Sequence, residues 1–257
     1  MDFEQTFALS IKSGNKNRLF DLKIDSYMAN EPFVIDLSAY IQSDNICFNN
    51  ITYPTPLIFS IFCKRPEIFD FLLQMGADLN KEVNGWKPVH YTILLKNPKI
   101  LKMILERDPS QVKSLDRNGS SPLHLAVTSG DFGIVYQLLE KGAEINAKNP
   151  GGNTPLHFSV LNHDKLTIQA LIAFGADKGI KNNNGETPDT IAKKKNNSLA
   201  IEILSLPAQP KSYIEAMFQS EKNDAVEPAS IETGLDYKIN EVEKRLSHIE
   251  EIIYQME

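Results

Sequence analysis

The sequence predicts an all-α solenoid of stacked helix pairs, because a motif, a period and an apolar pattern share one register. Prolines that suit the first turn of a helix stand 32, 34, 33 and 33 residues apart, a period of about 33 residues. An apolar residue follows each of these prolines by sixteen positions. The five prolines are Pro56, Pro88, Pro122, Pro155 and Pro188, and the apolar residues are Leu72, Ile104, Leu138, Leu171 and Leu204.

The clearest repeat runs from Ser121 to Asn146 and indicates two short antiparallel helices. Ser121 can cap the first helix, and Ser129-Gly130 ends it. An apolar stripe at three- and four-residue spacings follows, and Gly142 supplies the left-handed residue that closes the second helix. One such hairpin cannot bury its own stripe, so it needs similar neighbours.

The motif Ser-Pro-Leu-His-Leu-Ala at residues 121–126 recurs in altered form at each of the other prolines, most closely as Thr154-Pro-Leu-His157. With the 33-residue period, it resembles the ankyrin repeat family over roughly Thr55 to Leu206. The resemblance implies an ankyrin-repeat solenoid with about five repeats, short hairpin loops and a binding rather than catalytic function.

The chain is expected to divide into four segments. Residues 1–54 form a degenerate N-terminal capping repeat with an insertion at 25–54, which is apolar enough to pack on the first repeats. The repeats themselves occupy residues 55–207. Residues 208–234 have linker composition with a possible short helix near Tyr213, and residues 235–257 form a heptad-patterned acidic helix.

Composition favours a soluble protein with one sizeable core, since 42% of the 257 residues are hydrophobic and 23% are charged. No apolar run is long enough to span a membrane, and Asp2 and Glu4 argue against a signal peptide. A cytoplasmic location is therefore expected, with Cys47 and Cys63 reduced.

Charge is concentrated at the C-terminal end of the chain. Residues 208–257 hold 11 acidic and 5 basic side chains, so the whole net charge of −6 lies there. No basic face suits nucleic acid, and the one basic cluster, Lys193 to Lys195, is interpreted as a solvated helix end.

The acidic tail carries apolar residues at alternating spacings of four and three, which is typical of a coiled coil. Basic residues at g and acidic residues at e favour parallel self-association, although a lone helix folding back onto the repeats is the alternative. The predicted homo-oligomer contacts are Leu235, Ile239, Val242, Leu246, Ile249 and Ile253.

No catalytic, cofactor or metal site is expected. His90, His124 and His157 occupy the same place in different repeats, and adjacent helices are about 10 Å apart, so their rings cannot converge on one ion. The family resemblance implies that they hydrogen-bond within and between the loops. Gly119, Gly152 and Gly185 stand three residues before a repeat proline and are interpreted as turn residues with positive φ.

What remains is a concave surface of hairpin tips and first helices, where the family resemblance places partner contacts two residues before and six or seven after each proline. Several of these positions are large and apolar, which favours an interaction site. The competing interpretation is that the insertion or the tail covers them in cis. The predicted partner-binding residues are Phe62, Trp86, Leu94, Leu95, Arg117, Ser120, Thr128, Asn153, Leu161 and Asn162.

Two substitutions test these assignments. Trp86→Ala should weaken partner binding by roughly 2 kcal/mol or more with little loss of stability. Leu123→Ala should instead lower stability through a core cavity.

The irregular repeats and the Glu-rich tail are also similar to ankyrin effectors that intracellular bacteria inject into host cells. That similarity implies a host protein as the partner, a host-cytosol location and a secretion signal in the tail. The rival hypothesis is an enzyme whose active part lies in the N-terminal insertion or is supplied by a partner. About 30 residues are too few for an independent catalytic domain.

Overall fold

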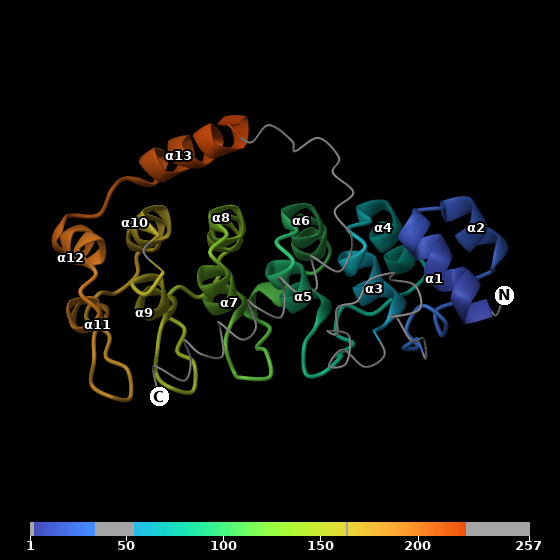
Figure 1. Ribbon diagram of the computed structural model, residues 1–257, viewed down its shortest axis with the longest axis horizontal. Helices are drawn as coiled ribbons and strands as arrows, with labels where there is room; N and C mark the ends of the chain where they lie inside the picture. Colours follow the sequence, from blue (N-terminus) through green and yellow to red (C-terminus); the bar gives the residue numbers. More distant parts are fainter. Residues whose placement is uncertain (1–2, 34–53, 163, 225–257) are drawn as a thin grey trace, which may run out of the picture. The chain divides into compact units, whose positions relative to one another are not determined.

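The computed structural model describes residues 3–33, 54–162 and 164–224 (Figure 1). These residues belong to two compact units. Unit 1 comprises the described residues up to Asp108, and unit 2 comprises those from Pro109 to Asp224. Every regular element in the described ranges is a helix, which confirms the all-α prediction.

Unit 1 contains three helix pairs. The first pair is α1 (Phe3–Ser13) with α2 (Lys16–Asp21), the second is α3 (Pro56–Phe62) with α4 (Pro66–Gln74), and the third is α5 (Pro88–Leu94) with α6 (Pro98–Arg107). Helix α3 packs on α1 and α5, and α4 packs on α6. The helices therefore stack first on first and second on second.

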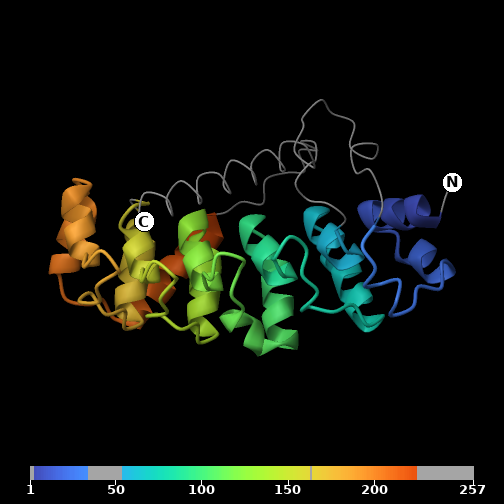
Figure 2. The same cartoon turned by 90° about the horizontal axis from the view of Figure 1, so that it is seen from below.

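Unit 2 begins with a 3-10 turn, η3 (Pro109–Lys113), and continues with three further pairs. These are α7 (Pro122–Ser129) with α8 (Phe132–Glu140), α9 (Pro155–Ser159) with α10 (Lys165–Ala173), and α11 (Pro188–Lys194) with α12 (Ser198–Ser205). The first helices α7, α9 and α11 form one layer and the second helices α8, α10 and α12 form the other (Figures 1 and 2). A last helix, α13 (Lys211–Asp224), follows.

Local sequence explains where the first helices begin. Thr55 and Ser121 are extended residues whose hydroxyl oxygens accept hydrogen bonds from the backbone N–H groups of Ile58 and His124. A proline follows each cap at the first helical position, where its missing N–H would have no partner. Gly130 then ends α7 in the left-handed conformation, with φ of 65°.

The core lies between the two helix layers of each unit. The apolar residues sixteen positions after the repeat prolines are buried, as the 33-residue register predicts. Leu123, the second residue of α7, has no exposed surface. The repeat pattern therefore identified the core correctly.

The start of the predicted insertion packs on the first repeats of unit 1. The Asn30 side chain donates to the Gly76 carbonyl at 2.9 Å and accepts from the Asp78 N–H at 2.7 Å. Phe33 is 3% exposed and its ring lies 5.1 Å from that of Phe7. This part of the insertion thus packs against the first two helix pairs of unit 1.

The segment after the repeats is more helical than its linker composition suggests. The sequence indicated a short helix near Tyr213, whereas α13 extends over 14 residues. The predicted coiled-coil contacts Leu235, Ile239, Val242, Leu246, Ile249 and Ile253 lie outside the described residues, and so does Cys47. In the part of the chain that is described, no helix combines the length and apolar content that a bilayer crossing requires.

Candidate protein-interaction surface

The loop tips of unit 2 are built around a polar residue six positions before each repeat proline. A side-chain oxygen of Asp116 accepts hydrogen bonds from the N–H groups of Asn118 and Ser120, both at 2.8 Å. Asn182 does the same for Asn184 at 3.0 Å and Glu186 at 2.9 Å. Burial raises the pKa of Asp116, although its two backbone hydrogen bonds act in the opposite direction. These bonds hold the tips in a fixed shape.

Consecutive tips also brace one another. The Asn183 side chain donates to the Pro150 carbonyl at 2.9 Å, and the Lys148 ammonium donates to the Lys181 carbonyl at 3.2 Å. Gly119, Gly152 and Gly185 have φ of 70°, 75° and 76°, which confirms the prediction of positive φ.

Gly152 carries a steric requirement that Gly185 lacks. A Cβ at Gly152 would overlap the side-chain oxygen of Asn183 and lie 2.8 Å from its backbone N, whereas a Cβ at Gly185 would meet nothing within 4 Å. Gly185→Ala is therefore expected to lower the free energy of unfolding by about 1 kcal/mol through left-handed strain alone. Gly152→Ala should cost at least about 2 kcal/mol because the next tip must also shift. Urea denaturation of the pair measures the difference, and equal losses would contradict the close approach.

The repeat histidines link each loop to the next. The Nδ1 atoms of His124 and His157 accept hydrogen bonds from the N–H groups of Ser121 at 3.2 Å and Thr154 at 3.0 Å. The Nε2 atoms then donate to carbonyls of the following loop, Asn153 at 2.9 Å and Glu186 at 3.2 Å. Both ring nitrogens are thus used by the neutral imidazole.

Burial lowers the pKa of His124 to about 4, and the hydrogen bond to the Asn153 carbonyl opposes this shift. Burial lowers the pKa of His157 as well. A histidine that titrates at about 6.5 when unfolded but at about 4 when folded binds its proton first in the unfolded state. Stability is then complete above pH 6.5 and falls as the pH drops towards 4.

Acidification across that window is expected to remove up to about 3 kcal/mol of unfolding free energy through His124. Urea denaturation of the wild type and of His124→Gln, followed from neutral pH to pH 4, isolates this contribution. The gap in stability between the two proteins should shrink as the pH falls. A gap that stays constant would exclude His124 as the group responsible.

The four apolar members of the predicted binding set in unit 1 are buried. Phe62 is 2% exposed, Trp86 3%, Leu94 0% and Leu95 5%. The indole of Trp86 meets the His90 ring edge-on at 5.7 Å. These four side chains are therefore buried and do not face solvent, contrary to the expectation. Burial of Trp86 argues against a Trp86→Ala protein of nearly unchanged stability, and that outcome stays a prediction. The role of the four residues in partner binding stays a prediction.

Three polar members of the set are buried in unit 2. Ser120 is 5% exposed, Thr128 8% and Asn153 2%. The Thr128 hydroxyl donates to the His124 carbonyl at 2.8 Å, and the Asn153 side-chain oxygen accepts from Asn182 at 2.9 Å. These contacts, and the hydrogen bond from the Ser120 N–H to Asp116, give the three residues structural roles within the loops and helices.

The remaining members retain access to solvent. Arg117 is exposed at a loop tip, and Leu161 and Asn162 are half-buried after α9. The Asn162 amide donates to the Val127 carbonyl at 2.6 Å and so connects two repeats. Arg117 and Leu161 thus keep solvent-accessible surface, and their role in partner binding stays a prediction.

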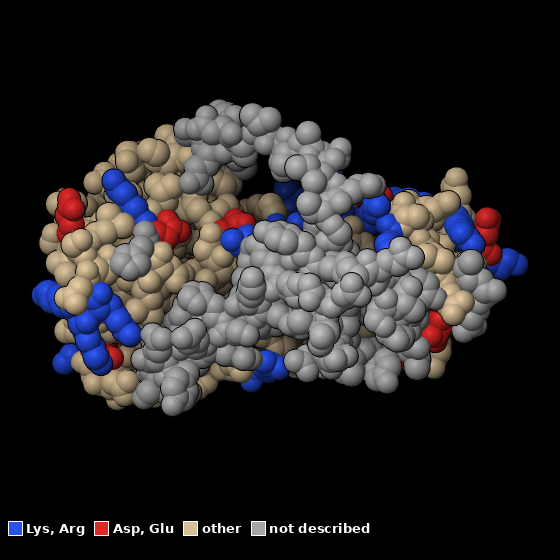
Figure 3. Space-filling view, viewed as in Figure 1, with Lys and Arg blue, Asp and Glu red and all other residues tan. Residues whose placement is uncertain are grey.

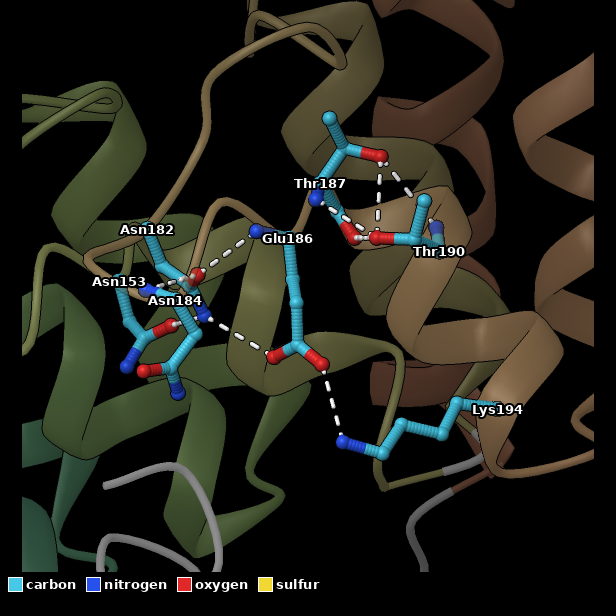
Figure 4. A network of polar contacts seen from close by, with 7 residues as sticks. All are labelled: Asn153, Asn182, Asn184, Glu186, Thr187, Thr190 and Lys194. Atoms are coloured by element: carbon cyan, nitrogen blue, oxygen red, sulfur yellow. Dashed lines mark hydrogen bonds and ion pairs between the residues drawn. The ribbon is translucent and has the colours of Figure 1, made fainter.

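The last repeat replaces apolar contacts by a polar network (Figure 4). The Lys194 ammonium lies 3.0 Å from a Glu186 carboxylate oxygen and, with its hydrogen bond, lowers the pKa of Glu186. Thr190 stands where the earlier repeats have histidine, and its hydroxyl accepts from the Thr187 N–H at 2.7 Å. The threonine preserves the cap within this repeat, as suits a terminal repeat.

Exposed polar side chains gather along these tips and the adjoining end of α11. Lys193, Lys194 and Lys195 are exposed, and Figure 3 shows Lys and Arg atoms grouped over the α11 end of unit 2. We give the name tip surface to five of the exposed residues of the tips and α11. Its members are Arg117, Lys148, Asn183, Asn184 and Lys194.

In the described ranges, no group of three or more His, Cys, Asp or Glu side chains could hold a metal ion. His124 and His157 use both ring nitrogens in hydrogen bonds of the loops. The side chains of the tip surface are amides and cations, which can form hydrogen bonds and charge pairs with another molecule.

Comparison with known proteins agrees with this architecture. A family model described as ankyrin repeats in three copies matches residues 57–149 and 123–213. Alpha-latrocrustotoxin-Lt1a of Latrodectus tredecimguttatus is 33% identical over 94 residues, which are 37% of this chain and 7% of the toxin. NF-kappa-B inhibitor alpha of Homo sapiens is 32% identical over 109 residues, 40% of this chain and 34% of the inhibitor.

A third relative, phosphocholine transferase AnkX of Legionella pneumophila, is 30% identical over 96 residues, 36% of this chain and 10% of the transferase. The chain thus spans between 7% and 34% of the length of these three relatives. The family model, by contrast, covers more than half of the chain, from the first repeat to the start of α13. The chain belongs to the ankyrin repeat family.

Proposed function

We propose that the chain is a non-enzymatic interaction module that binds a protein partner through the tip surface of unit 2. Ankyrin repeats are typically binding scaffolds, and the relatives include a protein named as an inhibitor of NF-kappa-B. The observation that carries the proposal is the bracing of consecutive tips, such as the Asn183 hydrogen bond to Pro150. A braced surface loses little conformational entropy when a partner binds.

The charge of the tip surface indicates the kind of partner. Arg117 and Lys148 are exposed, and Lys194 forms an ion pair with Glu186. The surface is therefore polar and carries more positive than negative charge. Such a surface suits an acidic patch on a partner, which would raise the association rate and fix the orientation.

The test compares two triple variants by quantitative capture from an extract of the cells that express the protein. Replacing Arg117, Lys148 and Lys194 by alanine should weaken partner binding at least about tenfold, or about 1.4 kcal/mol. The control removes three charges elsewhere, at the exposed residues Lys99, Lys102 and Lys141. Equal binding by the two variants would remove the tip surface from the interaction.

We also propose that residues 235–257 mediate self-association, on the strength of the heptad spacing of Leu235, Ile239, Val242, Leu246, Ile249 and Ile253. Two copies joined there would present two tip surfaces and increase avidity. Light scattering of the full chain and of residues 1–224 gives the subunit count. A monomeric full chain would contradict this part of the proposal.

We further propose that the chain is a bacterial effector that is injected into host cells and acts in the host cytosol. The support for this proposal is the Glu-rich tail together with the similarity to the Legionella pneumophila transferase. A translocation reporter fused to the chain, with and without residues 208–257, tests it. Secretion that is independent of the tail would contradict the assignment of a signal to that segment.

A further inference from the structure

Helix α13 is seated against the second helices of unit 2. It contacts α8 and α10, and Figures 1 and 2 both show it alongside them. Phe218 is 6% exposed and stacks on Tyr136, with ring centroids 4.3 Å apart and planes inclined by 28°. Ile214, one turn earlier, has no exposed surface. The Lys211 ammonium lies 4.4 Å from the centre of the Phe174 ring.

The face that α13 covers differs in composition from the same face of other repeats. Eleven and fourteen residues after the repeat proline, α8 has Gly133 and Tyr136, and α10 has Leu166 and Gln169. At these positions α4 has Glu67 and Asp70, and α6 has Lys99 and Lys102. We call Phe132, Gly133, Tyr136, Leu166, Gln169 and Phe174 the outer groove. The helices α8 and α10 therefore carry uncharged residues at these outer positions, where α13 lies on them, whereas α4 and α6 carry charged residues.

Gly133 lies directly beside Phe218 in the groove. A Cβ added at Gly133 would stand 3.5 Å from the Phe218 ring, an ordinary contact distance. The Phe132 ring lies 6.1 Å from Phe218 in an edge-on arrangement. Phe218 is thus enclosed by aromatic side chains of α8, the geometry of an anchor residue in a helix-binding groove.

One group in the groove is not satisfied by α13. Gln169 follows Tyr136 by one 33-residue period, so it occupies the same side of its helix, and it is only 9% exposed. Its side-chain oxygen has no hydrogen-bond donor among the described residues. A buried acceptor without a donor costs about 1 to 3 kcal/mol. Helix α13 therefore covers the Gln169 side-chain oxygen without donating a hydrogen bond to it.

The attachment of α13 is compatible with release. Residues 207–210, which include Pro207 and Pro210, connect it to α12 and are largely exposed. The Lys178 ammonium donates to the carbonyls of Leu204 and Leu206, both at 2.9 Å, and fixes where the chain leaves the stack. Beyond that point, a 14-residue helix is only marginally stable on its own and depends on its docking contacts.

We propose that the outer groove is a second interaction surface, which binds an amphipathic helix of a partner and which α13 closes in its absence. The partner helix is expected to present a basic, an aliphatic and an aromatic residue at positions i, i+3 and i+7, as Lys211, Ile214 and Phe218 do. A hydrogen-bond donor opposite Gln169 would let it bind more tightly than α13. Binding of the partner helix would release α13 and, with it, the chain that follows α13.

A synthetic peptide of residues 207–224, labelled for fluorescence anisotropy, is the probe. It is titrated with the full-length wild type and with the full-length double variant Ile214→Ala, Phe218→Ala. The two substitutions weaken the docking of the variant's own α13, which then competes less with the peptide for the groove. The variant should therefore bind the peptide at least tenfold more tightly than the wild type does. Lys211→Glu, which changes only an exposed side chain, should give a smaller increase in the same direction.

Two matched controls complete the experiment. Adding Tyr136→Ala to the double variant should abolish binding, and a peptide carrying Phe218→Ala should not bind. Circular dichroism confirms that each variant retains its helices. Equal affinity for the wild type and the double variant would overturn closure by α13. Peptide binding that survives Tyr136→Ala would overturn the groove itself, and so would failure of the double variant to bind.

Discussion

Replacing Leu123 by alanine is expected to lower the free energy of unfolding by about 2 to 5 kcal/mol. Leu123 has no exposed surface. It lies in the first turn of α7, directly after the Ser121 cap and Pro122. Truncation leaves a cavity that the rigid neighbours cannot fill. Because each repeat depends on its neighbours, the loss should appear as a lower melting temperature of the whole unit.

Leu115 provides the matched control in the same unit. It is 58% exposed, so Leu115→Ala removes the same atoms from a position where they contribute little. Its cost should be within about 0.5 kcal/mol. Similar melting temperatures for the two variants would refute the assignment of Leu123 to the core.

Trp86→Ala is expected to lower the free energy of unfolding of unit 1 by about 3 to 5 kcal/mol. The indole is 3% exposed and packs against the rings of His90 and Tyr91, at 5.7 and 6.3 Å. The Tyr91 hydroxyl donates to the Val83 carbonyl at 2.9 Å, so loss of the indole also loosens the loop that begins at Val83. Urea denaturation measures the loss.

Tyr27, at 71% exposure, is the aromatic control for Trp86. Tyr27→Ala should leave the denaturation midpoint almost unchanged. A Trp86→Ala protein that keeps full stability but loses partner binding would restore the original interpretation of Trp86 as an exposed contact.

Most of the fold could be predicted because each helix pair repeats the same local signals. A cap such as Ser121, a proline at the next position and a left-handed residue such as Gly130 define a helix from its own sequence. The loop conformations could be predicted as well, because Gly152 and Gly185 stand at the same position before a repeat proline and both have positive φ. Repetition turned weak local signals into a consistent pattern.

The binding surface was less predictable because position in a repeat does not determine exposure. The register placed Trp86 two residues before a repeat proline and Leu94 six residues after it, but it could not show that both side chains are buried. At the same positions in the last repeat, Glu186 and Lys194 form an ion pair in solvent. Side-chain size and the neighbours decide whether such a position is a contact or part of the core.

The outer groove was missed although the sequence contained its signal. Tyr136 stands fourteen residues after a repeat proline, where Asp70 and Lys102 stand in earlier repeats. An apolar residue at a solvent-facing position indicates a covering element, and Ile214 and Phe218 supply one. Comparing the outer positions repeat by repeat would have predicted α13 as a docked helix.

Photo-cross-linking from the loop tip tests the binding role most directly. p-Benzoylphenylalanine is placed at Arg117 in one protein and, as a control, at Glu202 on the exposed side of α12 in another. The account predicts that the first captures a discrete protein partner from cell extract and that the second does not. Capture from position 202 alone would contradict binding through the tip surface.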